Sequence, residues 1–295
     1  MKRNVLIQII SSCLLVVLLC SVSTADTHVT KVVESFLKHV DSLDALDAQK
    51  KSSIKSSLEQ QQSSDRLTDG LIKIYPKYSA AVESSDDENV DQAVELLGPL
   101  AESEDKFLAA DANFYLARTL MNNERFEEAM PRLEQLVGEM GDHSAHQGSA
   151  QYFKGVAQAG LLKNQEAVAS FTDFILNHPD APERLRVSAW RQVQQLQGIK
   201  EGKLDDVYQR MDYSRRRLTQ IETGERTQEE QKKIVNMLTK MIKEEEKKEA
   251  SSSAKKAAPE RPASKLLVRS PVNKPNQSLV KVNKVVRVIT LTAKS

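Results

Sequence analysis

Small and large apolar residues recur along the middle of this chain in a pattern that predicts pairs of antiparallel helices. Around Ala129 and Ala167, a small residue is combined at helical spacing with large apolar residues. Such spacing lets two helices approach closely and bury one face, while the neighbouring pair must bury the other face. The anchor positions Ala93, Ala129, Ala167 and Val207 lie 36, 38 and 40 residues apart. Residues 65–220 are therefore predicted to form an all-α solenoid of three to four helical hairpins.

The sequence also predicts helices, turns and loops before and within this region. Apolar residues between Val32 and Leu43 repeat at helical spacing, so residues 26–64 are predicted to be an N-terminal helical segment. Pro76 should bend or stop a helix, and residues 177–182 form a strong turn signal. Residues 138–148 contain three glycines and are predicted to be a solvated loop. No segment before residue 279 alternates with period two over a useful length, so no strands are expected in the body.

A final helix is predicted over residues 221–250. Thr227 and Glu230 have the spacing of a capping box, in which each side chain bonds a free amide at the helix start. This helix is interpreted as a cap on the exposed end of the solenoid. A dimerising coiled coil is the alternative, although two heptads are fewer than the ~3–4 usually needed.

The N-terminus has the three-part form of a secretory signal peptide over residues 1–25. Lys2 and Arg3 precede an apolar run from Val5 to Cys20, and small residues precede a cut after Ala25. The protein is therefore expected to be exported, either periplasmic or secreted. An uncleaved membrane anchor is the alternative, and the run of about 16 residues lies at the short edge of the ~17–25 needed to span a bilayer.

The cysteines narrow the possible chemistry. Both of them, Cys13 and Cys20, lie inside the signal segment. The mature chain would therefore have no disulfide, no thiol nucleophile and no zinc–thiolate site, and its fold would depend on the packed core.

Charge divides the chain into an acidic body and a basic tail. Residues 26–250 carry a net charge of −10, and residues 251–295 carry +9. The tail is rich in Ser, Lys, Ala and Pro and is predicted to be a disordered low-complexity segment. It is a candidate for contact with an anionic polymer or a membrane surface. Residues 279–292 have strong β character and could add a strand to a partner's sheet, or could remain part of a disordered tail.

Residues 91–218 resemble tetratricopeptide-type repeats. Three stretches are also similar to motifs of exported planctomycete tetratricopeptide-like proteins: Ala181–Gln192, Met211–Leu218 and Thr227–Val235. The likeness covers roughly residues 30–250 and does not extend to the tail. It implies a helical-repeat fold and export. Since that family is largely without assigned activity, it implies little about function.

Linear motifs of catalysis are missing from this sequence. It has no G-x-S-x-G, no phosphate-binding glycine loop and no H-E-x-x-H. We therefore expect a non-enzymatic protein with no cofactor, no metal and no nucleic-acid partner. His143 and His146, beside Asp142, have the spacing of a weak metal site, and an unrecognised hydrolase using them is one alternative. Residues 215–217 are three arginines and are interpreted as surface charge.

The concave face of the solenoid is the predicted binding site for a protein or peptide partner. It would be lined by the first helix of each hairpin, where planar hydrogen-bonding and aromatic groups suit an extended peptide. The alternative for the two tyrosines is that they fill the space between helices. The other alternative function is structural: an envelope protein held to an anionic polymer or membrane by its basic tail. The sequence does not determine the oligomeric state. The predicted site residues are Tyr115, Arg118, Asn122, Tyr152, Arg191 and Gln195.

Overall fold

The computed structural model describes residues 27–60, 65–85 and 90–256. Contacts between residues divide the chain into two units, residues 1–243 and 244–295. The predicted signal segment 1–25 lies outside the described residues, as does the tail from residue 257 onward, including the β-prone segment 279–292. Among the described residues, no helix is both long enough and apolar enough to span a membrane.

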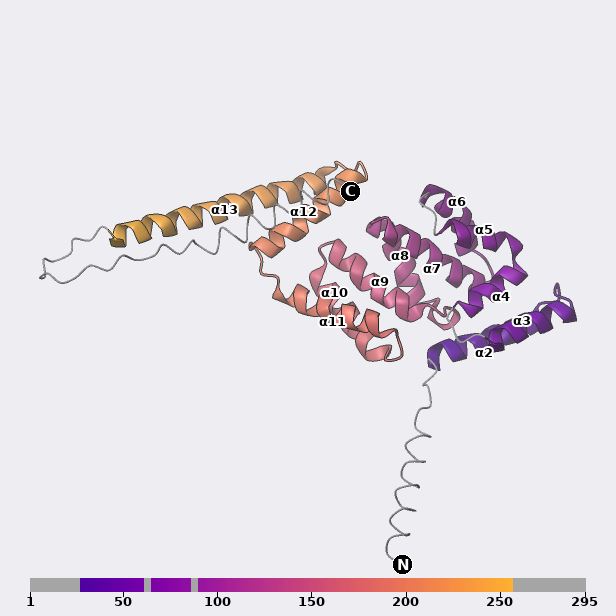
Figure 1. Cartoon of the computed structure of the whole chain (residues 1–295). Coiled ribbons are helices and arrows are strands. Elements are labelled where there is room, and N and C mark those ends of the chain that lie inside the picture. The colour runs from indigo at the N-terminus through magenta and orange to yellow at the C-terminus, as the bar shows by residue number, and fades with distance from the viewer. Residues whose placement is uncertain (1–26, 61–64, 86–89, 257–295) are drawn as a thin grey trace, which may run out of the picture. The chain divides into compact units, whose positions relative to one another are not determined.

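Every regular element in the described part of the chain is a helix, which confirms the all-α prediction. Neighbouring helices pack against each other in chain order from α2 to α11, and this order is consistent with a helical solenoid (Figure 1). The helices are α2 (Thr27–Ser42), α3 (Ala48–Gln60), α4 (Arg66–Ile74), α5 (Pro76–Ser84), α6 (Val90–Ala101), α7 (Lys106–Asn122), α8 (Phe126–Val137), the 3-10 helix η1 (Gly141–His143), α9 (Gln147–Gly160), α10 (Asn164–Asn177), α11 (Glu183–Gly198), α12 (Leu204–Thr219) and α13 (Glu225–Lys256).

The repeat anchors lie in the core, as their spacing predicts. Ala93, Ala129 and Ala167 are fully buried, and Val207 is nearly so. Helices α9 and α10 approach closely at Gly155, where a Cβ atom would lie 2.8 Å from the Phe171 ring. Small residues therefore set the spacing of adjacent helices here, because side-chain volume limits how near two backbones can come.

The N-terminal helix α2 covers the glycine-rich segment after α8. The Phe36 ring of α2 packs edge-on against Phe107 at 5.2 Å, and His28 Nε2 lies 3.1 Å from the Ser144 carbonyl oxygen. Ser144, Ala145 and His146 are consequently buried. The prediction that residues 138–148 form a solvated loop is confirmed at residues 138, 139 and 142, which are exposed, and is wrong at residues 144–146, which are buried.

Pro76 separates two helices as expected, with α4 ending at Ile74 and α5 starting at Pro76. The residue at the junction, Tyr75, donates a hydrogen bond from its hydroxyl to Asp105 Oδ2 at 2.5 Å. Asp105 caps the N-terminus of α7 and also lies 2.9 Å from His39 Nε2 of α2. One carboxylate therefore ties α2, the α4–α5 junction and α7 together.

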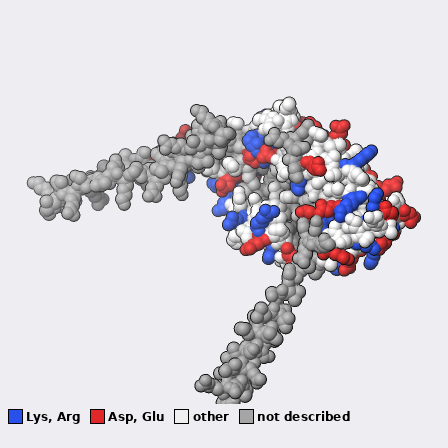
Figure 2. Space-filling view, turned by 45° about the vertical axis from the view of Figure 1, so that its right-hand side comes forward, with Lys and Arg blue, Asp and Glu red and all other residues white. Residues whose placement is uncertain are grey.

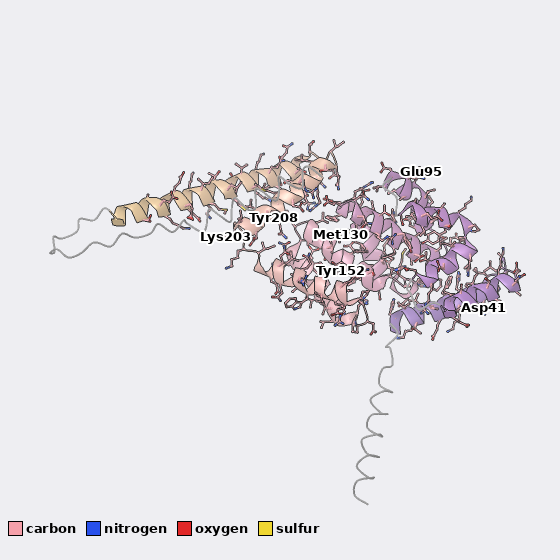
Figure 3. All side chains as sticks on the ribbon, viewed as in Figure 1. Asp41, Glu95, Met130, Tyr152, Lys203 and Tyr208 are labelled. Carbon is pink, nitrogen blue, oxygen red and sulfur yellow. The ribbon has the colours of Figure 1, made fainter. Side chains whose placement is uncertain are left out.

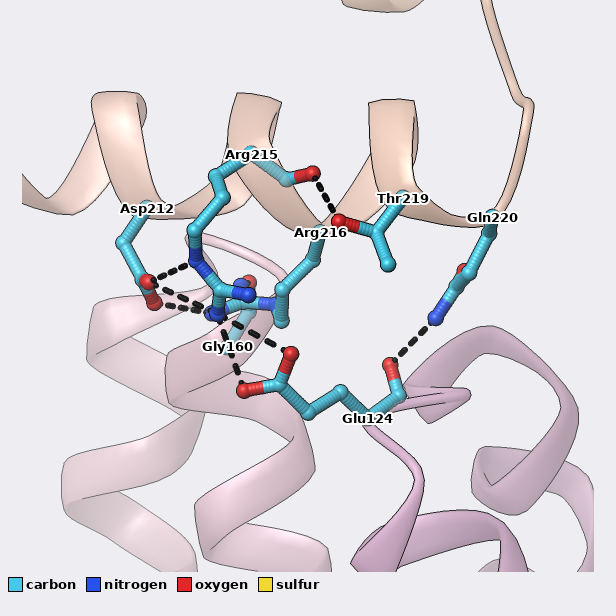
Figure 4. A network of polar contacts seen from close by, with 7 residues as sticks. All are labelled: Glu124, Gly160, Asp212, Arg215, Arg216, Thr219 and Gln220. Carbon is cyan, nitrogen blue, oxygen red and sulfur yellow. Dashed lines mark hydrogen bonds and ion pairs between the residues drawn. The ribbon is translucent and has the colours of Figure 1, made fainter. Parts of the chain in front are cut away.

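Helix α12 is held in place by its arginines (Figure 4). Arg216 donates to the Gly160 carbonyl oxygen at the end of α9 and to Asp212, and its guanidinium lies 4.9 Å above the Phe126 ring. Arg215 bonds Glu124 in the α7–α8 turn at 2.9 Å. Arg216 is only 8% exposed. The interpretation of residues 215–217 as surface charge is wrong at this position, because a buried guanidinium satisfies the carbonyl at a helix end.

The predicted capping box at the start of the last helix is also absent. Helix α13 begins at Glu225, so Thr227 already lies within its first turn. The Thr227 hydroxyl donates to the Glu222 carbonyl at 2.8 Å, and Glu230 accepts from Arg210 at 2.5 Å instead of capping. These residues fasten α13 to α12, a tertiary role that the local pattern could not distinguish from a cap.

Charged side chains of both signs cover the body. On the face shown in Figure 2, acidic and basic residues are interspersed over the described helices. This face therefore presents no broad field of one sign for an oppositely charged polymer.

Candidate functional site

Helix α11 carries an exposed aromatic residue on the face turned away from α10. Trp190, the single tryptophan, is 58% exposed, and Val187 beside it is 40% exposed. A shallow depression of about 450 Å³ lies along this face. Its lining residues are Glu183, Arg184, Val187, Ser188 and Arg191. We call the exposed residues Glu183, Arg184, Val187, Trp190, Arg191 and Gln195 the α11 surface.

The opposite face of α11 explains why this one is open. Ala189, Val193 and Leu196 are buried together with Phe171 and Phe174 of α10. Residues at this spacing share one side of a helix, so Trp190 and Val187 are turned away from α10. Helix α11 therefore buries its small and aliphatic residues against α10 and leaves the Trp190 ring outside.

Tyr152 reaches this region from α9 (Figure 3). Its hydroxyl lies 2.8 Å from Ser188 Oγ of α11, and its ring lies 5.7 Å from Phe171 and 5.6 Å from Phe174. Three predicted site residues, Tyr152, Arg191 and Gln195, are thus on two adjoining helices. Tyr152 is half-buried, so it contributes more to the packing between helices than to an exposed contact area.

The predicted residues on α7 lie in a different environment. Tyr115 is only 5% exposed, and its hydroxyl donates to Thr68 Oγ1 of α4 at 3.4 Å. Arg118 lies 4.7 Å above the Tyr115 ring and donates to Ser85 Oγ, just after α5, at 3.0 Å. Asn122 is exposed at the end of α7. The prediction of one open groove that includes Tyr115 and Arg118 is wrong, because α4 and α5 cover this side of α7.

Burial also changes the acidity of the Tyr115 hydroxyl. Desolvation of the hydroxyl, together with the nearby Asp111 carboxylate, raises the pKa of Tyr115 to about 12. The side chain is a buried hydrogen-bond donor to Thr68. This outcome matches the alternative in which the tyrosine fills the space between helices.

A buried polar network joins α5, α7 and α9. The Tyr78 hydroxyl donates to Asp111 Oδ2 at 2.9 Å, and His146 Nε2 lies 3.3 Å from Asp111 Oδ1. The His146 ring stacks on Phe114 at 3.9 Å. Burial and the Asp111 charge raise the pKa of Tyr78. Tyr, Asp and His in contact can transfer protons in principle, but all three side chains here are shielded from solvent, so a substrate has no access.

The two histidines of the suggested metal pattern have different neighbours. His143 packs edge-on against Phe107 at 5.0 Å, and burial lowers its pKa. His146 belongs to the buried network with Asp111. In the described residues, no group of three or more His, Cys, Asp or Glu side chains is arranged to hold a metal ion. The hydrolase alternative therefore gains no support from the arrangement of these two residues.

The α11 surface shows which information the sequence pattern lacked. Arg191 and Gln195 were predicted from their repeat position, whereas Arg184, Val187 and Trp190 were not. Their i, i+3 and i+4 spacing was readable as one helix face. The sequence did not reveal which face the neighbouring helix covers.

Comparison with known proteins found no related family model, no curated relative and no similar solved structure.

Proposed function

We propose that this chain is a non-enzymatic protein-interaction scaffold that binds a segment of a partner protein on the α11 surface. The observation that carries the proposal is the exposure of Trp190 beside Val187, with Arg184 and Arg191 on the same helix face. Tryptophan and arginine are the residues most enriched at the energetic centres of protein interfaces. An exposed apolar group rimmed by polar side chains is typical of an interaction site.

Rigidity of the support strengthens this proposal. Helix α11 packs on α10 through buried residues, and the Tyr152–Ser188 hydrogen bond joins it to α9. A partner would meet a preformed surface, so little conformational entropy would be lost by the scaffold on binding. Arg184 and Arg191 favour acidic or carbonyl-rich segments, because guanidinium groups bind carboxylates in a bidentate geometry.

The proposed scaffold is built from tetratricopeptide-like hairpins. We infer that α7–α8 and α9–α10 are two tetratricopeptide-like hairpins, with α5–α6 as a degenerate unit before them. The packing of α9 against both α7 and α11 supports this description, because first helices of successive hairpins adjoin in such solenoids. Export to the periplasm or outside the cell, directed by residues 1–25, belongs to the proposal as well.

A photocrosslinking experiment tests the proposed surface. The chain would carry a photoreactive side chain at position 191, or at Lys31 on the exposed face of α2 as the matched control, and would be illuminated in extracts of its native envelope. We expect a discrete protein adduct from position 191 that is absent from position 31.

Binding measurements with the captured protein complete the test. The double variant W190A/R191A should bind at least roughly 30-fold more weakly than the native chain, since hot-spot truncations cost about 2 kcal/mol or more. L176A removes another exposed apolar residue, 71% exposed on α10, and should leave the affinity unchanged. Native-like affinity in W190A/R191A would refute the assignment of the α11 surface.

A further inference from the structure

Helices α12 and α13 present an open apolar face that is separate from the α11 surface. On α12, Leu204, Tyr208, Met211 and Leu218 repeat at spacings of four, three and seven residues and are between 46% and 69% exposed. Figure 3 labels Tyr208 on this helix. On α13, Val235 and Ile242 are 61% and 59% exposed. Apolar residues at this spacing share one stripe of a helix. We call these six residues the open face.

The other sides of the two helices are already occupied. Tyr213 and Arg216 of α12 are buried on the side that meets the body. Glu230 of α13 is buried, and its ion pair with Arg210 at 2.5 Å joins α13 to α12. Side chains of α12 and α13 thus join the two helices, and the open face is an additional surface.

A groove of about 650 Å³ runs between the two helices on this side. It is predominantly apolar, and a row of side chains from one further helix fits such a groove in the way that helix-in-groove complexes do. Its lining residues are Met211, Ser214, Arg215, Leu218, Thr219, Gln231, Ile234 and Val235.

The order of charges along α13 identifies the helix that would lie there. Two acidic residues, 229–230, precede two lysines, 232–233, and later three glutamates, 244–246, precede two lysines, 247–248. Two such helices in antiparallel alignment about a centre near residue 238 bring each acidic block to the height of a basic block. Parallel alignment in register would instead set every block against its own like charge.

We propose that the open face is a homodimer interface in which α13 of a second copy lies antiparallel along the α12–α13 groove. The resulting contact is isologous, since the same residues of each copy meet about a two-fold axis. Val235 of one copy lies opposite Ile242 of the other, and Lys232 lies on the same flank as Glu246 of the second copy. Two hairpins then bury their apolar stripes in a four-helix arrangement.

The mass of the purified full chain in solution is the first test. The monomer has a mass of 33.0 kDa, and light scattering across a dilution series should give about twice that value at micromolar concentration. V235E/I242E should be monomeric with unchanged helicity, because both residues are exposed in the single chain. A monomeric native chain at the highest concentration would overturn the proposal, and so would a dimer that persists in V235E/I242E.

A charge exchange tests the antiparallel register. K232E and E246K, each alone, should raise the dimer dissociation constant by roughly tenfold or more, because each sets like charges opposite one another at two symmetric places. The double variant K232E/E246K should return to within about threefold of the native value, since the exchanged pair attracts again. The control for K232E is K31E/K38E, at two exposed lysines of α2. It also makes the chain more negative and should leave the dimer intact. Failure of the double variant to recover would overturn the antiparallel arrangement.

Discussion

Glu124 and Leu162 hold the same left-handed backbone conformation, with φ angles of 57° and 63°, in the turns after α7 and α9. In both turns the amide of the next residue donates to a carbonyl five residues earlier, at 2.9 Å. This is the hydrogen bond that closes a helix before a reversal. The two residues are 38 positions apart, which is also the spacing of Ala129 and Ala167. The hairpins thus share a turn geometry although their turn residues differ completely in chemistry.

Ile221 repeats this conformation after α12, with φ of 61°, and it is a β-branched residue that is 86% exposed. Left-handed backbone costs such a residue about 1–2 kcal/mol, and glycine avoids this cost at the expense of chain entropy. We expect Ile221→Gly to raise the free energy of unfolding by roughly 0.5–1 kcal/mol in urea titrations. Thr223→Gly, nearby but without positive φ, should be neutral or destabilising. A loss of stability in Ile221→Gly would contradict the strain argument.

Gly155 is predicted to be intolerant of any side chain. A Cβ atom there would lie 2.8 Å from the Phe171 ring, so Gly155→Ala must push α9 and α10 apart. We expect a loss of about 1–3 kcal/mol of stability, as for other overpacked cores. The matched control is Gly198→Ala at the end of α11, where a Cβ meets nothing within 4 Å. That variant should be neutral or slightly stabilising by thermal melting.

Neighbouring arginines of α12 should differ sharply in importance. Arg216 is buried and satisfies the Gly160 carbonyl, so Arg216→Ala should lower stability by about 2–3 kcal/mol. Arg215 has a half-exposed side chain in ion pairs with Glu124 and Asp212, and Arg215→Ala should lower stability by less than about 1 kcal/mol. Hydrogen exchange of α12 amides would report the difference locally. Equal effects of the two substitutions would contradict the docking role of Arg216.

Asp105 should contribute to the acid sensitivity of the fold. Burial acts to raise its pKa, but hydrogen bonds from Tyr75 and His39 outweigh burial, and the pKa is lowered from 3.8. A carboxyl with a lowered folded pKa stabilises the fold above its unfolded pKa and loses that contribution as pH falls through the folded pKa. We therefore expect Asp105→Asn to be less stable than the native chain at pH 7. The difference should shrink as pH falls below about 3.8.

Urea titrations at a series of pH values measure this effect. Glu230 also has a lowered pKa, because hydrogen bonds from Lys233 and Arg210 outweigh its burial. It therefore contributes to the loss of stability at low pH in the native chain and in Asp105→Asn alike. The quantity to follow is therefore the difference between Asp105→Asn and the native chain. A difference that is constant with pH would show that the carboxylate charge is not what stabilises the α7 cap.

Helix type and the repeat anchors were predictable because they depend on local spacing. Periodic apolar residues define which side of a helix is buried, so Ala93, Ala129 and Ala167 could be assigned to the core from their neighbours alone. The separation of α4 from α5 at Pro76 followed from the missing amide of proline. These features need no knowledge of residues far away in the chain.

The exposure of the candidate site residues depends on which other helices cover them. Repeat position predicted Arg191 and Gln195 on the concave face of the solenoid, and in the structure both side chains are exposed on α11. The same reasoning misplaced Arg118, which packs on Tyr115 and Ser85 beneath α5. The two arginines lie on different kinds of helix, because α7 is buried on nearly every side whereas α11 buries a single face. Which elements cover α7 depends on helices that precede it in the chain.

The sequence by itself determined an all-helical body, the buried small residues between adjacent helices, and the change from an acidic body to a basic tail. Only the tertiary structure decided that Trp190 is exposed and Arg216 is buried. The periodicity of apolar residues shows that a helix has a polar and an apolar face, and this information extends over only a few helical turns. Which face becomes interior depends on the element that packs over it, and contacts between segments as distant as Gly160 and Arg216 are set by the free energy of the whole chain.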